Sequence, residues 1–305
     1  MFKISGFYDE VSPDLNTQVK IIKKLNGKYI CPRLIQTKNI ASYTAEEFGK
    51  EILPVLMKNE IKISSIGSPI GKIDLNDSQA YASQLKKLKE LVKIAEMANC
   101  KYIRCFSFFT GPNPTDRDLR QVVAKWRGFL EEVEGHNVTI LHENEKKIFG
   151  DIPSRVLDLY YSLNHPQFKL CYDASNYIQC GVDPRDAFLK TKDYTVYYHM
   201  KDCYHGVEVP LGTGEGRIKE LLADLVADDY TGFLTLEPHT AKYAMLKRFF
   251  AIIPFLTFTK MGRVFRKIGK DSGIPVMRKV TREEVMIMQH ENLLKLIKEI
   301  NGKYE

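Results

Sequence analysis

Four side chains that could bind a metal ion lie at the ends of apolar, strand-like stretches in the second half of the sequence. They are Glu143 in LHENE, Asp173 in CYDASN, His199 in YYHMKD and Glu237 in LTLEPH. Their separation of about 25 to 40 residues is typical of a strand, a helix and the turns between them. In a closed parallel barrel, such strand ends meet at one mouth, where barrel enzymes carry out their chemistry. Three carboxylates and an imidazole at one point would form a site for a divalent metal ion.

The alternation of side chains along a strand places the four donors on one face. Residues i and i+2 point the same way, so the side chain of Glu143 lies on the same face as those of Leu141 and Glu145. His142 lies on the opposite face. The same alternation groups Asp173 with Cys171, His199 with Tyr197 and Lys201, and Glu237 with Thr235. A single acid at a strand end is usually a helix cap or a solvated loop residue. Several acids buried together need a counter-charge, because their repulsion and desolvation cost several kcal/mol.

Strand-like and helical patterns alternate along the whole sequence. The strand-like stretches are 4–9, 29–34, 61–68, 102–108, 138–144, 168–175, 196–202 and 232–238. The helical patterns are 14–26, 45–59, 77–99, 116–134, 153–163, 184–191, 216–227 and 282–300. Eight alternations predict an α/β fold that is a single (β/α)8 TIM barrel, with one domain over residues 1–305 and barrel strands between about 4 and 238.

A doubly wound open sheet is the alternative architecture. It needs a glycine-rich phosphate-binding turn after the first strand, and Gly6-Phe7-Tyr8-Asp9 is not such a turn. The G-x-G-x-G run at 212–216 comes late and precedes a helix, so we interpret it as a loop and not as a dinucleotide fingerprint.

The composition is that of a globular protein in a reducing compartment. Of the 305 residues, 44% are apolar and 27% are charged, which is ordinary for a soluble domain. Lys3, Asp9 and Glu10 interrupt any early apolar run, so we expect no signal peptide, no transmembrane segment and a cytoplasmic location. The six cysteines show no CxxC pairing and several lie in strand-like runs, which indicates buried thiols.

The positive charge is concentrated in one segment. Residues 246–280 hold nine Lys or Arg against one acid, which leaves 36 basic and 37 acidic residues elsewhere. A near-neutral body argues against nucleic acid as a partner. We predict that 245–280 is a basic and apolar insertion before a closing helix at 282–300, packed as a lid or a subunit contact in a possible homo-oligomer. Contact with a membrane surface or an anion is the alternative.

Several segments together resemble a known family. They are Glu143-Asn144-Glu145, 171–176, 199–202 and 236–239, with Phe7-Tyr8-Asp9-Glu10 and 65–72. Over roughly residues 2–240 the sequence resembles the sugar phosphate isomerase/epimerase family of the xylose-isomerase-like TIM-barrel superfamily. The resemblance implies one divalent metal ion (Mn, Mg, Co or Zn) bound by Glu143, Asp173, His199 and Glu237. It also implies a small sugar or polyol substrate, for which Asn176, Lys201 and Ser68 are the candidate binding residues.

The implied chemistry is the transfer of an α proton in a ketose or polyol ketone. A metal ion polarises the carbonyl and its neighbouring hydroxyl, so that the proton between them is easier to remove. Lys201 is placed by alternation to stabilise the resulting enediolate. Glu143 and Glu237 are the candidate catalytic residues, removing and returning protons on opposite faces of the substrate.

Other functions remain open at this stage. Ketose 3-epimerases of the family carry a histidine three residues after the metal aspartate, where this sequence has Asn176, and no clear arginine follows His199. These departures keep a polyol dehydratase of the inosose type as an alternative, beside a non-catalytic sugar-binding barrel. A repair enzyme of the endonuclease IV type needs several more metal-binding histidines, and of the seven present only His199 is suitably placed.

Overall fold

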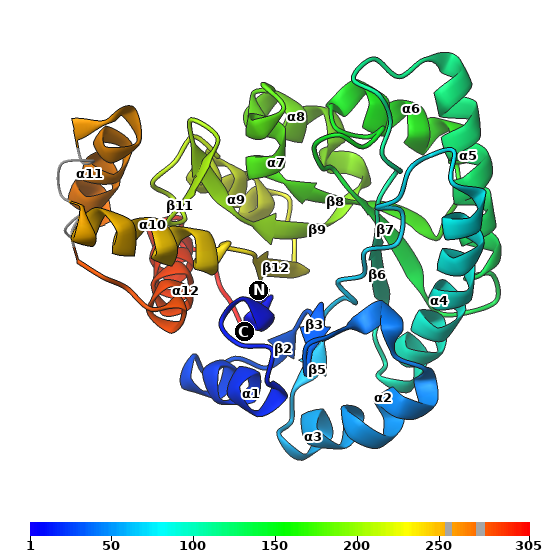
Figure 1. Ribbon diagram of the computed structural model, residues 1–305, viewed down its shortest axis with the longest axis horizontal. Coiled ribbons are helices and arrows are strands. Elements are labelled where there is room, and N and C mark those ends of the chain that lie inside the picture. The colour runs from blue at the N-terminus through cyan, green and yellow to red at the C-terminus, as the bar shows by residue number, and fades with distance from the viewer. Residues whose placement is uncertain (254–257, 273–277) are drawn as a thin grey trace.

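The computed structural model describes residues 1–253, 258–272 and 278–305. Parallel strands curl around a central axis and helices surround them (Figure 1). One sheet of six strands contains, in spatial order, β1 (Lys3–Gly6), β12 (Phe233–Leu236), β9 (Thr195–Met200), β8 (Phe168–Asp173), β7 (Thr139–Glu143) and β6 (Tyr102–Cys105). All of these neighbours pair in parallel. The carboxyl ends of these strands therefore lie on one side.

Two short strands complete the ring between β1 and β6. β2 (Tyr29–Ile30) and β5 (Lys62–Ile63) pair in parallel with each other. Backbone hydrogen bonds of the residues that follow them join them to the larger sheet. The Cys31 amide donates to the Gly6 carbonyl at 3.0 Å, the Ile66 amide donates to the Tyr102 carbonyl at 2.8 Å, and the Arg104 amide donates to the Ile66 carbonyl at 3.0 Å. The strands thus follow one another around the barrel in chain order, which confirms the predicted (β/α)8 architecture.

The helices occupy the positions that the apolar periodicity predicts. They are α1 (Leu15–Lys24), α2 (Ala45–Glu51), α3 (Leu53–Lys58), α4 (Ser78–Met97), α5 (Asp116–Glu131), α6 (Pro153–Leu163), α8 (Pro184–Thr191) and α9 (Ile218–Ala227). The prediction of a single helix over 45–59 is wrong, because the helix is interrupted at Ile52, between α2 and α3. Pro54 lies in the first turn of α3, where a proline is tolerated, whereas inside one continuous helix it would remove a hydrogen bond.

The two faces of β7 have different neighbours, as the alternation predicts. Leu141 forms a buried cluster with Cys171 and Tyr197 inside the barrel. His142 faces outward, with its Nε2 atom 2.9 Å from the Ser107 hydroxyl and its ring 5.7 Å from the ring of Trp126. Glu143, next along the strand, therefore points to the barrel interior with Leu141.

A hairpin after β9 is stabilised by the glycine-rich loop. It consists of β10 (Asp202–Tyr204) and β11 (Val207–Val209). The carboxylate of buried Asp202 accepts hydrogen bonds from the amides of Gly212, Gly214 and Gly216, each at 2.9 Å. A Cβ atom at Gly214 would lie 2.3 Å from Asp202 Oδ1, so a side chain there would clash. The glycine run is a loop, as predicted, and its amides bind a carboxylate of the protein itself.

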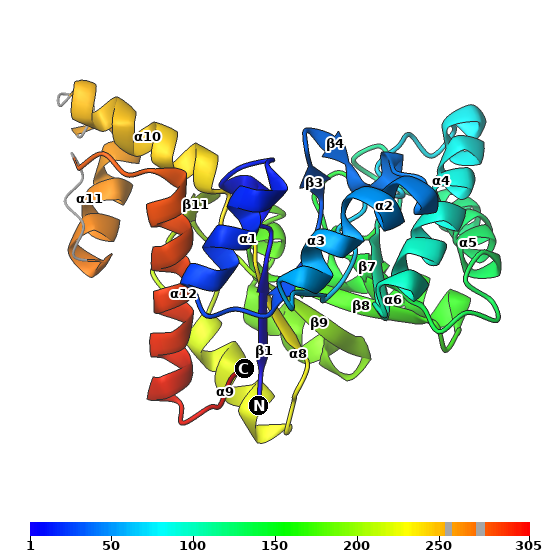
Figure 2. The same ribbon diagram turned by 90° about the horizontal axis from the view of Figure 1, so that it is seen from below.

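The described parts of the segment 245–280 include helices that lie beside this hairpin. α10 (Thr240–Ile252) and α11 (Lys260–Ser272) precede α12 (Arg282–Glu299), and all three lie on one side of the barrel (Figures 1 and 2). They share a second apolar cluster with β11, made of Val209, Tyr243, Phe250, Val264, Phe265, Val285 and Met288. Residues 254–257 and 273–277 of the predicted insertion lie outside the described residues. Its role as a lid, a subunit contact or a surface for membranes or anions stays a prediction.

The closing helix α12 agrees with the predicted range and leads the chain back to β1. The Phe2 amide donates to the Lys303 carbonyl and the Glu305 amide donates to the Phe2 carbonyl, each at 2.6 Å. The two chain ends are therefore adjacent (Figure 2). Among the described helices, none is long and apolar enough to cross a membrane.

The Asp202 interaction gives a stability prediction. Asp202→Ala removes one acceptor from three loop amides, so we expect the free energy of unfolding to fall by about 2–3 kcal/mol. Urea denaturation measures this change. Asp158→Ala, which alters an exposed aspartate of α6, is the control and should change the free energy by less than about 0.5 kcal/mol. Equal stability of the two variants would contradict the anchoring role of Asp202.

Candidate metal centre

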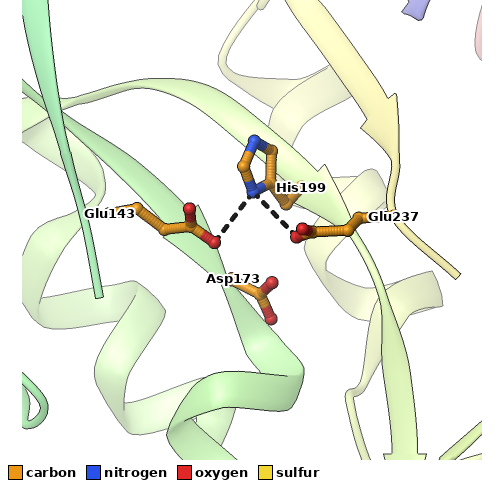
Figure 3. Close-up of side chains that lie close together, drawn as sticks. All are labelled: Glu143, Asp173, His199 and Glu237. Carbon is orange, nitrogen blue, oxygen red and sulfur yellow. Dashed lines mark hydrogen bonds and ion pairs between the residues drawn. The ribbon is translucent and has the colours of Figure 1, made fainter. Parts of the chain in front are cut away.

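Four neighbouring strands bring the predicted quartet together. Glu143 ends β7, Asp173 ends β8, His199 lies in β9 and Glu237 directly follows β12. The register places Asp173 beside His199 and Thr235 beside His199, so Glu237 lies two residues further on the same face. One ligand atom from each of the four lies within 4.8 Å of the others, and all four side chains are buried (Figure 3).

The imidazole of His199 lies between two carboxylates. Its Nδ1 atom is 2.9 Å from Glu143 Oε1 and 3.3 Å from Glu237 Oε2 (Figure 3). Asp173 caps α7 (Ala174–Gln179), since its Oδ1 atom accepts a hydrogen bond from the Asn176 amide at 3.0 Å. The other carboxylate oxygen of Asp173, Oδ2, lies 2.8 Å from Lys201 Nζ. Nδ1 of His199 and one oxygen from each acid are thus the atoms that could bind a metal ion.

Asn144 fixes the relative position of two of these strand ends. Its side chain donates to the Asp173 carbonyl at 2.9 Å and accepts from the Asp173 amide at 2.9 Å. β7 and β8 are therefore joined where Glu143 and Asp173 project. The quartet is held by backbone and amide hydrogen bonds as well as by its own contacts.

The carboxylates differ in how fully their charge is compensated. Burial alone would raise the pKa of Glu143, but His199 and Arg104 bring it down to about 2. Burial acts in the same direction on Glu237, and Lys201 and His199 hold the pKa of that carboxyl well below its usual range. For Asp173, burial prevails over Lys201 and raises the pKa to about 6. One of three buried acids is thus still short of positive charge.

This donor set fits a divalent cation. Carboxylate oxygens suit Mg²⁺ and Mn²⁺, and the addition of one imidazole suits Zn²⁺ and Co²⁺ as well. The incomplete compensation at Asp173 indicates that further positive charge would be accepted here. The four residues form a candidate site for one metal ion, and their chemistry does not distinguish among Mn, Mg, Co and Zn.

A cavity of about 250 Å³ borders the quartet, with Glu143 and Glu237 in its wall. Its lining residues are Arg33, Asn39, Gly67, Pro69, Lys72, Arg104, Glu143, Glu145, Lys201, Glu237 and His239. Charged residues of both signs dominate the wall. Lys72 pairs with Glu145 at 3.0 Å, so the charges at this wall compensate each other.

Two arginines of the site are absent from the sequence-based prediction. Arg104 of β6 is buried, and its Nη1 atom lies 3.1 Å from Glu143 Oε2 and 3.7 Å from Glu237 Oε1. Arg33, which follows β2, reaches Glu237 Oε1 at 3.2 Å. The signal for Arg104 is an arginine inside the apolar strand YIRCF, because a buried arginine needs carboxylate partners. Arg33 has no comparable signal, since charged residues are common after a strand.

The three predicted substrate-binding residues have different surroundings. Lys201 lines the cavity. The Asn176 side chain donates to the Asn144 carbonyl at 2.8 Å and to Glu143 Oε1 at 3.3 Å. The Ser68 hydroxyl is buried and donates to the Arg104 carbonyl. Asn176 thus binds Glu143, a metal-ligand candidate, and Ser68 binds the backbone of β6 at Arg104. Contact of either residue with a substrate stays a prediction.

Comparison with known proteins identifies the family. The family model described as xylose isomerase-like TIM barrel matches residues 22–251, so the chain belongs to that family. A 3-dehydroshikimate dehydratase from Bacillus anthracis is 24% identical over 190 residues, covering 56% of this chain and 68% of the relative. The IolI protein, solved with a bound zinc atom, superposes with a TM-score of 0.71 at 12% identity, covering 98% of this chain and 99% of its own.

An L-ribulose 3-epimerase superposes with a TM-score of 0.70 at 13% identity and covers 99% of this chain and 96% of its own. At these identities the solved structures show a shared fold. The predicted resemblance to the isomerase and epimerase superfamily is therefore confirmed at the level of family and fold.

The quartet predicts a metal-binding measurement. After chelation, the protein should bind one equivalent of Mn²⁺, and His199→Ala should weaken that affinity at least 100-fold, about 2.7 kcal/mol, because the only nitrogen donor is lost. Isothermal titration calorimetry measures both values. His136→Ala is the control, since His136 is exposed and pairs with Glu96 on the surface. Wild-type affinity in the His199 variant would exclude this imidazole as a ligand.

Proposed function

We propose that the protein is a divalent-metal-dependent sugar isomerase or epimerase that transfers an α proton in a ketose or related polyol ketone. One observation carries the proposal. Two ionised, buried carboxylates, Glu143 and Glu237, lie on either side of His199 within the candidate metal centre (Figure 3). One of two such carboxylates can remove the α proton, and the other, once it has been protonated, can deliver a proton from the opposite face.

The cavity favours a small molecule rich in hydroxyl groups. Its wall combines hydrogen-bond donors such as Lys72 and Asn39 with acceptors such as Glu145. The wall charges occur in pairs, including Arg33 with Asp9 at 2.9 Å. A pocket with many paired polar groups suits an uncharged sugar or polyol, which both donates and accepts hydrogen bonds.

The residues of this chain supply the acid–base steps. A bound divalent ion would polarise the carbonyl and the neighbouring hydroxyl of the substrate. Glu143 or Glu237 then accepts the α proton, and the electron pair of the broken C–H bond forms the enediolate. Arg104 and Lys201 are cations beside these carboxylates, so they stabilise the developing negative charge. Delivery of a proton to the opposite face by the other carboxylate, once protonated, gives an epimer. Delivery to the adjacent carbon, with transfer of the hydroxyl proton to the former carbonyl oxygen, gives an isomer.

Dehydration is the second candidate, and two observations favour it. Asn176 stands where ketose 3-epimerases carry a histidine, and the curated relative from Bacillus anthracis is a dehydratase. Both reactions begin with the same removal of an α proton. In a dehydratase the electron pair then expels a β-hydroxyl, which takes a proton from a nearby acid such as Lys201 and leaves as water.

The experiment is a product analysis in D₂O with Mn²⁺ over a panel of ketoses, an inosose and 3-dehydroshikimate. The proposal expects α-deuterium incorporation together with an isomeric product. An unsaturated product would instead establish the dehydratase. Metal binding without any α-proton exchange across the panel would leave a sugar-binding barrel.

The catalytic carboxylates give a second prediction. Glu143→Gln and Glu237→Gln should each lower turnover at saturating Mn²⁺ at least 1,000-fold, about 4 kcal/mol in activation free energy, because an amide accepts no proton. Circular dichroism should show an unchanged fold. Glu220→Gln is the control, since Glu220 is exposed and pairs only with Arg217 among the contacts described. If Glu143→Gln or Glu237→Gln retained wild-type turnover, the substituted glutamate would not be a catalytic residue.

A further inference from the structure

Lys201 places a protein cation directly on two of the four metal-ligand candidates. Its side chain is 2% exposed, and its Nζ atom lies 2.8 Å from Asp173 Oδ2 and 3.4 Å from Glu237 Oε2. The same Glu237 oxygen lies 3.3 Å from His199 Nδ1. The ammonium group therefore contacts two of the metal-ligand candidates, and on Glu237 it uses the oxygen that approaches His199.

Arg104 contacts the quartet differently. Its Nη1 atom lies near Glu143 Oε2 and Glu237 Oε1, which are not the oxygens that approach His199 Nδ1. The guanidinium also donates to the carbonyls of Gly67 and Ser68, so its position is fixed. Arg104 can thus remain in place when a cation binds the carboxylate oxygens near His199. Lys201, by contrast, contacts one of those oxygens, Glu237 Oε2.

An ammonium group and a divalent ion on the same oxygens would repel each other strongly, because two cations a few ångströms apart in a buried site are poorly screened. Lysine can respond to this repulsion, since its charge is carried on a flexible four-carbon stem. Lys201 also lines the cavity. Its ammonium group therefore has polar space to enter without leaving the site.

We propose that Lys201 is an internal counter-cation that competes with the divalent metal ion for Asp173 and Glu237. Metal binding displaces its ammonium group from the two carboxylates into the substrate cavity. Loading of the metal and positioning of Lys201 for the substrate are then one coupled event. The inference rests on the metal centre of the proposed function, but not on the reaction that it catalyses.

The competition has two consequences for the purified protein. Without metal, Lys201 compensates part of the charge of the three acids, so chelation costs the wild type little thermal stability. With metal, displacement of the lysine lowers the apparent affinity of the ion. Removal of the Lys201 charge should therefore strengthen metal binding and weaken the chelated protein.

The test measures Mn²⁺ affinity by calorimetry and the melting temperature with and without chelator. We expect Lys201→Met to bind Mn²⁺ at least tenfold more tightly than the wild type and to gain more in melting temperature from Mn²⁺. Lys201→Arg keeps the charge and should stay within about threefold of the wild-type affinity. Lys72→Met is the matched control, because Lys72 lines the same cavity but pairs with Glu145 outside the quartet.

Each outcome decides the proposal. Equal or weaker Mn²⁺ binding by Lys201→Met overturns the competition and leaves the metal centre intact. Absence of binding in the wild type and in every variant overturns the competition together with the proposed function. If Lys201→Met does not fold when chelated, Lys201→Gln replaces it, since its amide can still donate to Asp173, and the same increase in affinity is expected.

Discussion

The concentration of three carboxylates at one buried point is the constraint on which the site depends. Glu143, Asp173 and Glu237 are almost fully excluded from water, and such a cluster is unstable without positive charge close by. The protein supplies part of it through Arg104 and Lys201. A divalent ion would replace the single charge of the Lys201 ammonium group on Asp173 and Glu237 with a double charge, and at the same time polarise a bound carbonyl. Stability and chemistry thus arise from one electrostatic requirement.

The barrel meets this requirement through its parallel register. Adjacent strands end at the same level, so a side chain at the end of each strand meets those of its neighbours without any special loop. The interior cluster of Leu141, Cys171 and Tyr197 packs the layer below the site. The fixed lower layer and the hydrogen bonds between strand ends restrict the donors to one arrangement, which lowers the cost of organising a bound ion.

Much of this organisation could be predicted from the sequence, because it depends on local periodicity. Alternation along β7 places Glu143 inward and His142 outward, and the structure agrees. The order of strands follows from eight repeats of one unit. The break of the predicted 45–59 helix at Ile52 was missed, although Pro54 is a visible local signal for it.

Features that depend on contacts between distant segments could not be predicted. The position of Arg33 near Glu237 joins residues 204 apart in the chain, and no local pattern encodes it. The hairpin of β10 and β11 is held by hydrogen bonds between Asp202 and the glycine-rich loop. The glycines in the sequence predict a loop but do not indicate its partner. The contact between Lys201 and Asp173, on which the proposed competition with a metal ion rests, is likewise a property of three-dimensional geometry.

The central claim is that one divalent ion binds at the junction of β7, β8, β9 and β12. Anomalous diffraction at the manganese edge, from crystals grown with Mn²⁺, tests it most directly. The account predicts one strong peak in contact with Nδ1 of His199 and with oxygens of Glu143, Asp173 and Glu237. A map with no peak among these side chains, or with the metal bound elsewhere, would contradict it.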